Sequence, residues 1–336
     1  MKVNAMKTPL YGLPAFMNAY TFAYCEKRGF TSINSDWKFS LSEMIRTTGC
    51  NTVILPVCAW QEHAYSTEIV SESPDIMSDD DVSAVCDYAR ELNLKIILKA
   101  MVNCRDGYWR AYIRFFDSPV PTEPGWSDWF LSWTLHVKHL AHLAEINRAD
   151  LLCIGCEMVG TDHRDREWRD LIDEVRSIYT GPLTYNCDKY QEDRLTWWDA
   201  VDVISSSGYY PVDQLTANFD RIKTVVEREK KIFMFMECGC PSRQNSQYRP
   251  NDWRYGGETD LQAQSEWYKA FTDCILRYPF VRGTGWWDWP ASRLYPTEDA
   301  INNRGYCTYG KPANNILHQF SSIITAPPSA PAPCRG

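Results

Sequence analysis

The chain has 336 residues, of which 44% are hydrophobic and 23% charged, a composition that excludes disordered and fibrous proteins and allows a large buried core. Its formal net charge of -8 and the absence of a Lys/Arg cluster argue against a nucleic-acid partner, whose phosphates need clustered cations. Residues 1–12 lack the apolar run of a signal peptide, and no stretch of about 18 apolar residues follows, so we expect no membrane span and a cytoplasmic protein.

Short apolar runs alternate along the chain with longer amphipathic stretches, the pattern of repeated strand–helix units around a parallel sheet. We expect strands at residues 11–19, 51–57, 95–102, 150–157, 182–186, 201–206, 231–237 and 281–287. We expect helices at residues 78–92, 127–147, 165–179, 216–230, 261–278 and 312–320, with a helical turn at 197–200. Eight strands favour a (β/α)8 TIM barrel, because an open doubly wound sheet uses fewer strands and begins with a Gly-rich phosphate turn that this chain lacks.

No interior segment has the composition of a linker between domains. We therefore predict one (β/α)8 catalytic domain over residues 1–325. Residues 326–336 are rich in Pro and Ala and offer little apolar surface to bury, so we expect a disordered tail there.

The thirteen cysteines are read as reduced, because the chain is long, their number is odd and several lie in apolar runs. The pairs Cys153/Cys156 and Cys238/Cys240 lack a second Cys/His pair at the spacing of a zinc site. The histidines at positions 63, 136, 139 and 142 also lack an identifiable third ligand. We predict neither a metal nor a cofactor.

Two glutamates end two of the most apolar predicted strands: Glu157 follows residues 151–156, and Glu237 follows residues 232–236. In a parallel barrel these strands are the fourth and the seventh, and their carboxyl ends meet at the mouth, where TIM-barrel chemistry takes place. A separation of about 5 to 5.5 Å would suit a retaining glycosidase, in which one carboxylate attacks the anomeric carbon and the other protonates the departing oxygen. The alternative is that each glutamate forms an ion pair with a strand-end Arg or Lys.

Polar and aromatic residues at other strand ends are candidates for sugar binding, because sugars stack on aromatic rings and bind amides and carboxylates. After the last strand, Trp287 and Trp289 are expected to share one face and form the floor of a sugar subsite, with Asp288 as a hydroxyl ligand. Further candidates at the ends of the second, third and fifth strands are Trp60, Lys99, Asn103 and Asn186. Each of these could instead be purely structural.

Four segments carry a family resemblance: Ile154–Glu157, Asp202–Pro211, Met236–Gly239 and Gly285–Pro290. They resemble glycoside hydrolase family 113, and the resemblance covers about residues 45–320. It implies a retaining (β/α)8 enzyme acting on β-1,4-mannans or mannooligosaccharides, with Glu157 as acid/base and Glu237 as nucleophile. Tyr209 matches the family's Tyr-Tyr-Pro, which implies a phenol that donates a hydrogen bond to the nucleophile.

The chain departs from that pattern at two points. Cys156 stands before the acid/base, where the wider clan has Asn and the family a small residue such as Thr, and residues 99–103 lack an expected His. The resemblance therefore implies the mechanism more directly than the substrate. The alternatives are the same mechanism on a β-glucoside, β-galactoside or β-xyloside, or a carbohydrate-binding barrel without turnover. The segments at residues 105–125 and 241–260 are expected to determine whether the site is open to polymers.

Overall fold

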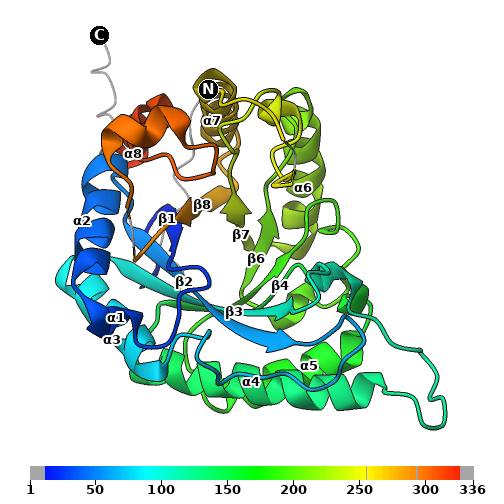
Figure 1. Ribbon diagram of the computed structural model, residues 1–336. Helices are drawn as coiled ribbons and strands as arrows, with labels where there is room; N and C mark the ends of the chain where they lie inside the picture. The colour runs from blue at the N-terminus through cyan, green and yellow to red at the C-terminus, as the bar shows by residue number, and fades with distance from the viewer. Residues whose placement is uncertain (1–11, 255, 293, 326–336) are drawn as a thin grey trace, which may run out of the picture.

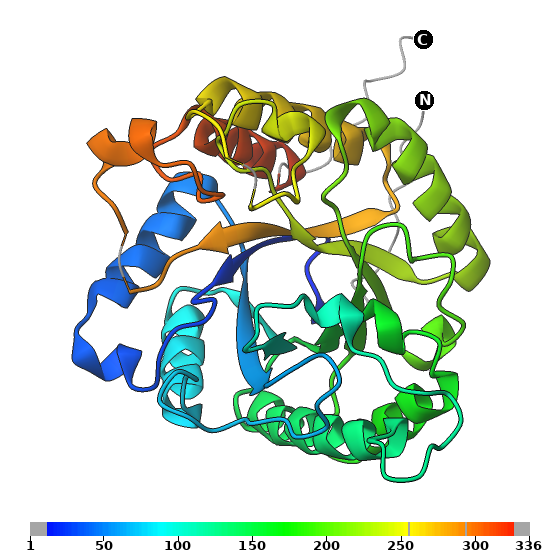
Figure 2. The ribbon, with the colours of Figure 1, turned by 45° about the vertical axis from the view of Figure 1, so that its right-hand side comes forward.

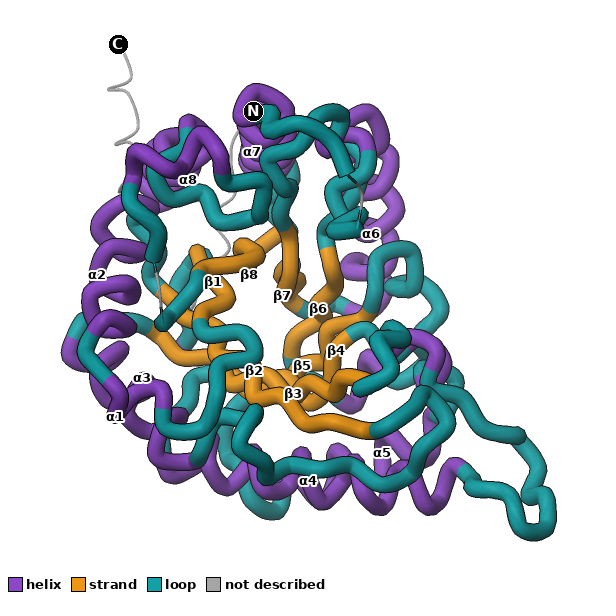
Figure 3. Tube along the Cα trace, viewed as in Figure 1, coloured by secondary structure: helices purple, strands orange, loops and turns teal. Residues whose placement is uncertain are grey.

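The computed structural model describes residues 12–254, 256–292 and 294–325, so the tail expected at 326–336 lies outside the described residues. Eight parallel strands pair in chain order and close into a barrel, surrounded by helices (Figures 1 and 3). The strands are β1 Met17–Phe22, β2 Thr52–Gln61, β3 Lys95–Cys104, β4 Leu151–Cys156, β5 Leu183–Cys187, β6 Val203–Ser207, β7 Ile232–Cys238 and β8 Val281–Trp289. The prediction of a (β/α)8 barrel is confirmed.

The helices lie outside the strands, with α4 and α5 on one side of the barrel and α7 and α8 on the other (Figure 2). They are α1 Phe30–Ile33, α2 Asp36–Thr48, α3 Asp79–Glu91, α4 Trp126–Ile146, α5 Asp165–Arg176, α6 Leu215–Glu229, α7 Leu261–Arg277 and α8 Pro312–Thr325. Between β5 and β6 the described chain forms only the 3-10 turn η4, Trp198–Ala200, as predicted.

The first strand–helix unit differs from the sequence prediction. The strand begins at Met17 rather than at residue 11, and the sequence analysis gave no helix where α2 lies. Its buried residues Trp37, Leu41 and Met44 do follow helical spacing, and the helix ends at Gly49 in the left-handed conformation, so a signal was present.

The inside of the barrel is layered. Its lower part is apolar and is filled by Met17, Ala19, Ile54, Ile97, Leu151, Cys153, Val203, Met234 and Met236. Nearer the carboxyl ends of the strands, the inward side chains become polar: Lys99, Thr184, Asn186, Ser205 and Ser207 are all fully buried. A polar layer therefore lies on an apolar floor, directly below the place where a TIM barrel carries its chemistry.

The outer side chains of the strands pack against the helices in a second, larger core that is rich in aromatic rings. Trp168 of α5 stacks on Trp197 with ring centroids 5.0 Å apart, and Tyr185 of β5 lies 5.0 Å from both. Burial of a large side chain of this kind stabilises the fold by roughly 1.5–3 kcal/mol. These contacts hold β5, whose end carries the candidate site residue Asn186, against the outer helices.

The described cysteines are all free, and all but Cys25 are buried, which agrees with their prediction as core residues. Cys153 belongs to the apolar floor of the barrel, and Cys238 packs between the barrel and the helices. Among the described helices, none combines the length and the apolar character that crossing a lipid bilayer requires.

Close packing at β8 generates a prediction about Gly285. A Cβ atom at this position would lie 2.3 Å from the Met236 carbonyl oxygen of β7, a backbone atom that cannot turn aside. We expect Gly285→Ala to lower the free energy of unfolding by about 2–3 kcal/mol, because overpacking forces the backbone to shift. At Gly125 the nearest atom to such a Cβ is 3.7 Å away, so Gly125→Ala should cost no more than about 1 kcal/mol. Urea unfolding of both variants measures the difference, and equal losses would contradict this account.

Candidate active site

The two predicted catalytic glutamates converge at the carboxyl ends of β4 and β7. Both are buried, with Glu157 7% and Glu237 4% exposed. A carboxylate oxygen of one lies within 4.8 Å of a carboxylate oxygen of the other. An oxygen–oxygen distance this short is compatible with the carboxyl-group separation of about 5–5.5 Å in retaining glycosidases.

The backbone at Glu157 departs from regular strand geometry. The pairing of β4 with β5 shifts register between Cys153 and Cys156, and Glu157 itself adopts a left-handed conformation with φ of 51°. Its N–H donates to the Asn186 carbonyl oxygen at 2.8 Å, which holds this conformation. A non-glycine residue in this region costs free energy and occurs preferentially at functional sites. The irregularity turns the Glu157 side chain towards Glu237.

Glu237 is held by a buried cation from β3. Lys99 forms an ion pair with its Oε1, and Lys99 Nζ also donates to Asn186 Oδ1 at 2.8 Å. Tyr209 donates to Glu237 Oε2 at 3.2 Å, so the hydrogen bond expected from the Tyr-Tyr-Pro motif is confirmed. Burial alone would raise the pKa of Glu237, but Lys99 and then Arg110 outweigh it, and the net pKa is lowered. Glu237 is therefore held as a carboxylate.

Glu157 has a different set of neighbours. Ser207 of β6 donates to its Oε1 at 2.6 Å, and the indole N–H of Trp109 donates to its Oε2 at 3.2 Å. Arg110 lies beside the same oxygen, with Nη1 at 3.4 Å. The Arg110 guanidinium is fixed from below, because its Nε donates to the Val102 carbonyl oxygen at 2.9 Å and its Nη2 to Asn103 Oδ1 at 2.6 Å.

The two expectations for the glutamates are therefore both met: each forms an ion pair with a cation, and the two side chains also converge. Glu237 pairs with Lys99 and Glu157 with Arg110, yet the two carboxylates still face one another. Carboxylates buried without such partners would be protonated or would destabilise the fold by several kcal/mol. The two ion pairs are what allow the convergence.

Cys156 completes a cluster that has the dimensions of a metal site, since its Sγ lies within 4.8 Å of oxygens of both glutamates. Burial raises the pKa of Cys156 well above its ordinary value, so the sulfur carries a proton, and metals bind the thiolate. Lys99 and Arg110 also place two positive charges against the cluster. This arrangement suits a pair of carboxylates better than a cation.

Two of the predicted sugar ligands lie below the glutamates. Lys99 and Asn186 have no exposed surface, and both point into the polar layer of the barrel. Lys99 contacts Glu237, and Asn186 accepts from Lys99 while its Nδ2 donates to Ser207 Oγ at 3.1 Å. In this structure they support the two carboxylates rather than offer an open face to a sugar hydroxyl.

Four other predicted ligands lie half-buried nearer the rim: Trp60, Asn103, Trp287 and Asp288. Trp60 and Asn103 are paired in register at the ends of β2 and β3. Trp287 packs edge-to-face on Tyr24 with ring centroids 4.7 Å apart. Burial raises the pKa of Asp288 to about 6. These residues belong to β2, β3 and β8, in the arc of the barrel that runs from β7 through β1 to β4.

Trp289 lies elsewhere, and the prediction that it shares a face with Trp287 is wrong. Along β1, Tyr20 and Phe22 are two positions apart, but their partners Trp286 and Trp289 in β8 are three apart. This extra residue breaks the alternation of side chains. Trp289 consequently points outward, where it is fully buried and its indole N–H donates to Ser40 Oγ of α2 at 3.0 Å.

The sequence analysis missed three neighbours of Glu157, namely Trp109, Arg110 and Ser207. Trp109 and Arg110 come from the segment after β3, and the sequence analysis gave that segment a role only as a whole. The run of aromatic residues in this segment could have indicated a binding role, since Tyr108, Tyr112 and Phe116, which lie near Trp109 and Arg110 in the sequence, are more than 60% exposed. Ser207 ends β6 on the inward face, two positions after Ser205, which strand alternation could have identified.

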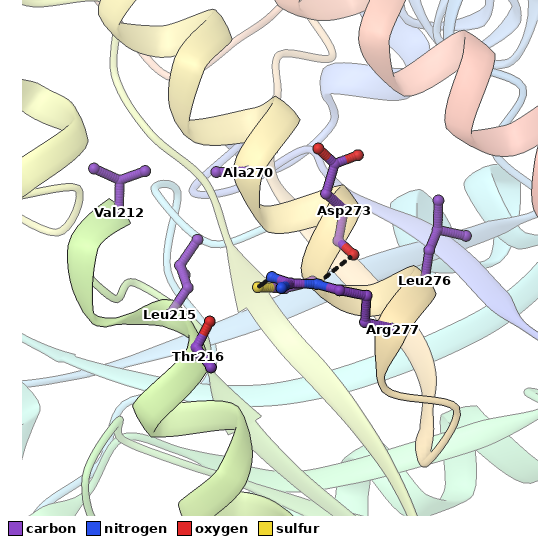
Figure 4. Close-up of a pocket in the computed structure, with 8 residues that line it drawn as sticks. Val212, Leu215, Thr216, Ala270, Asp273, Leu276 and Arg277 are labelled. Atoms are coloured by element: carbon purple, nitrogen blue, oxygen red, sulfur yellow. Dashed lines mark hydrogen bonds between the residues drawn. The ribbon is translucent and has the colours of Figure 1, made fainter.

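An open groove of about 580 Å³ lies outside the barrel, between the start of α6 and the second half of α7 (Figure 4). Leu215 and Ala270 are among its lining residues, and Arg277 donates to Cys274 Sγ at 2.9 Å beside it. Neither glutamate lines this groove. It is therefore separate from the candidate active site.

The fold and the paired carboxylates define a glycoside hydrolase, and comparison with known proteins agrees. The family model of Glycoside Hydrolase Family 113 matches residues 20–311. The chain belongs to this family.

Solved structures support the same assignment. The chain is similar to a GH113 β-1,4-mannanase at 41% identity, with a TM-score of 0.90, covering 92% of this chain and 99% of the other. It is also similar to a GH113 β-mannanase from Alicyclobacillus acidocaldarius, solved in complex with ManMIm, at 35% identity and a TM-score of 0.89, covering 94% and 99%. A β-D-glucuronidase from Dictyoglomus thermophilum, 14% identical with a TM-score of 0.62, shares the fold; this comparison covers 94% of this chain and 51% of that one. The comparison with curated proteins finds no match.

The different positions of Trp287 and Trp289 lead to opposite expectations for two matched variants. Trp289→Ala should lower the free energy of unfolding by about 3–5 kcal/mol, because it empties a closed site in the core. Trp287→Ala should cost much less stability but lower kcat/KM for an oligosaccharide substrate, because the ring is half-buried and packs against the cluster that contains Cys156, the neighbour of Glu157. Thermal unfolding and hydrolysis rates of both variants measure this contrast, and a Trp287→Ala variant with an unchanged kcat/KM would rule out a binding role.

Proposed function

We propose that the protein hydrolyses β-1,4-mannosidic bonds in mannan or mannooligosaccharides with retention of anomeric configuration. The close approach of the two carboxylates, with an oxygen of one within 4.8 Å of an oxygen of the other, supports this mechanism, because an inverting pair is spaced more widely to admit a water molecule. The substrate rests on similarity over nearly the whole chain to structures named as β-1,4-mannanases.

In the first step, Glu237 attacks the anomeric carbon while Glu157 gives its proton to the departing glycosidic oxygen. Glu237 suits the role of nucleophile because Lys99 and Tyr209 hold its carboxylate ionised. The C–O bond to the leaving sugar breaks, and a covalent glycosyl–Glu237 ester forms.

In the second step, Glu157 takes a proton from water, and the oxygen of that water attacks the anomeric carbon from the side the leaving group vacated. The ester bond breaks and Glu237 returns as a carboxylate. Ser207 and Trp109 donate to different oxygens of Glu157, so they fix the orientation of its carboxyl group in both steps.

The rim residues provide the binding surface in this proposal. The rings of Trp60 and Trp287 offer apolar faces for the C–H face of a sugar, and Asn103 and Asp288 offer polar atoms for hydroxyl groups. We also propose that the protein works in the cytoplasm, a suggestion supported by the free thiols of the described cysteines.

Substituting the two glutamates separately tests their roles. Glu157→Ala should lower kcat by about 10²–10⁴-fold through loss of proton transfer, and less for an aryl mannoside whose leaving group needs no proton. Glu237→Ala should abolish turnover of both substrates. Added azide should restore turnover, giving a product of inverted configuration from Glu237→Ala and one of retained configuration from Glu157→Ala, which NMR of the products distinguishes.

Glu174 of α5 provides the control, because its carboxylate lies on the outer surface paired with Lys138. Glu174→Ala should leave the rate unchanged. A panel of manno-, gluco- and xylo-oligosaccharides tests the substrate at the same time. The proposed substrate is wrong if the wild-type protein cleaves gluco- or xylo-oligosaccharides but leaves mannooligosaccharides intact.

The ion pair between Lys99 and Glu237 predicts a shift in pH dependence. Because Lys99 favours the charged form of Glu237, the Lys99→Met variant should have a Glu237 with a higher pKa. In the proposed mechanism Glu237 acts in its ionised form, so the acid limb of kcat/KM should move to higher pH. Lys138→Met, on the outer surface of α4, serves as the control, and an acid limb that stays in place in Lys99→Met would contradict the assigned role.

A further inference from the structure

Two thiols face one another at the rim of the barrel beside the candidate active site. Cys25 lies in the loop after β1 and Cys58 lies on β2, with their sulfur atoms 3.9 Å apart. A disulfide bond is about 2.05 Å long, so the two sulfurs would have to approach by roughly 2 Å. Cys25 belongs to a loop and is the described cysteine that is not buried, which makes both this movement and access from solvent feasible.

The surroundings of Cys25 favour its thiolate. The hydrogen bond from Cys58 lowers the pKa of Cys25, and the positive charge of Arg110 and a contact from Asn103 act in the same direction. Burial acts against them, but at Cys25 they outweigh it, whereas burial raises the pKa of Cys50 to about 12 and that of Cys104 to about 11. Because the thiolate is the form that reacts, Cys25 is set apart by both exposure and charge.

A series of side-chain contacts connects this thiol pair to Glu157. Asn103 Nδ2 lies 3.7 Å from Cys25 Sγ, and Asn103 Oδ1 accepts from Arg110 at 2.6 Å. Arg110 in turn pairs with Glu157. Movement of Cys25 would therefore pull on the residue that orients the Arg110 guanidinium.

The pair is also in contact with the proposed sugar-binding surface. Cys58 belongs to a small apolar cluster with Met101 and Cys156, against which Cys25 and Trp287 pack. Tyr24, next to Cys25 in the chain, packs on the Trp287 ring. A new covalent bond at Cys25 would change this surface as well as the position of Arg110.

We propose that Cys25 and Cys58 form an oxidation site at which a peroxide produces a disulfide and thereby slows hydrolysis reversibly. The Cys25 thiolate attacks one peroxide oxygen and breaks the O–O bond, which gives a sulfenic acid on Cys25 and, after protonation, one water or alcohol molecule. The Cys58 sulfur then attacks the Cys25 sulfur, the S–O bond breaks, and the hydroxide leaves as water with the Cys58 proton. Two thiols lose two hydrogens and the peroxide is reduced.

Treatment of the full-length protein with hydrogen peroxide tests the proposal by two readouts. Peptide mass spectrometry should find a Cys25–Cys58 crosslink and a loss of two hydrogens, a result that does not depend on any substrate. The hydrolysis rate should fall, and dithiothreitol should restore both the free thiols and the rate. Cys25→Ser should keep its own untreated rate after peroxide, and Cys58→Ser should form no internal disulfide.

Cys274→Ser is the matched control, because Cys274 lies on α7 outside the barrel, and this variant should respond to peroxide as the wild type does. Cys58→Ala provides a second variant if the serine does not fold. The absence of the crosslink in treated wild type overturns the proposal. A crosslink that leaves the rate unchanged, or a loss of rate of the same size in Cys25→Ser, overturns the link to catalysis.

Discussion

Two carboxylates share one buried space, and the electrostatic cost of keeping them there explains the arrangement of the residues around them. Each negative charge is matched by one cation, Lys99 from inside the barrel and Arg110 from the loop above it. The two cations differ in their consequences. Lys99 is fully buried and binds Glu237, which stays charged in the proposed mechanism, whereas Arg110 lies nearer the rim beside Glu157, which gains and loses a proton in that mechanism.

Much of the fold could be predicted because parallel strands buried on both faces appear as apolar runs. The strands β3 to β8 end within two residues of the expected positions, whereas β1 ends three residues later and β2 four residues later than expected. The two glutamates stood out for the same reason, since each is an acid directly after such a run. The first strand was placed too early and α2 was missed. There the polar surface residues around Trp37 and Leu41 obscure the helical spacing, and Phe39 on the same helix is 60% exposed.

The residues around the glutamates were less predictable, because they depend on geometry that strict alternation does not describe. One extra residue in β8 turns Trp289 into the outer core, although its spacing from Trp287 indicated a shared face. Arg110 reaches Glu157 from a loop, and loops carry no periodicity from which a direction could be read. Lys99 and Asn186 were predicted to bind sugar, but in the structure they support the glutamates. The depth of a residue along the barrel axis decides between these two roles, and the residue type alone does not reveal that depth.

The apolar floor beneath Lys99 determines from which end of the barrel substrate and water reach the glutamates. Met17, Ile54 and Met234 help to fill the interior of the barrel, so the barrel is a packed core and not a channel. The substrate, the water molecule and the products therefore share one entrance, at the carboxyl ends of the strands. The segment that carries Trp109 contributes exposed aromatic side chains next to this entrance, so it narrows the route by which sugars arrive and leave.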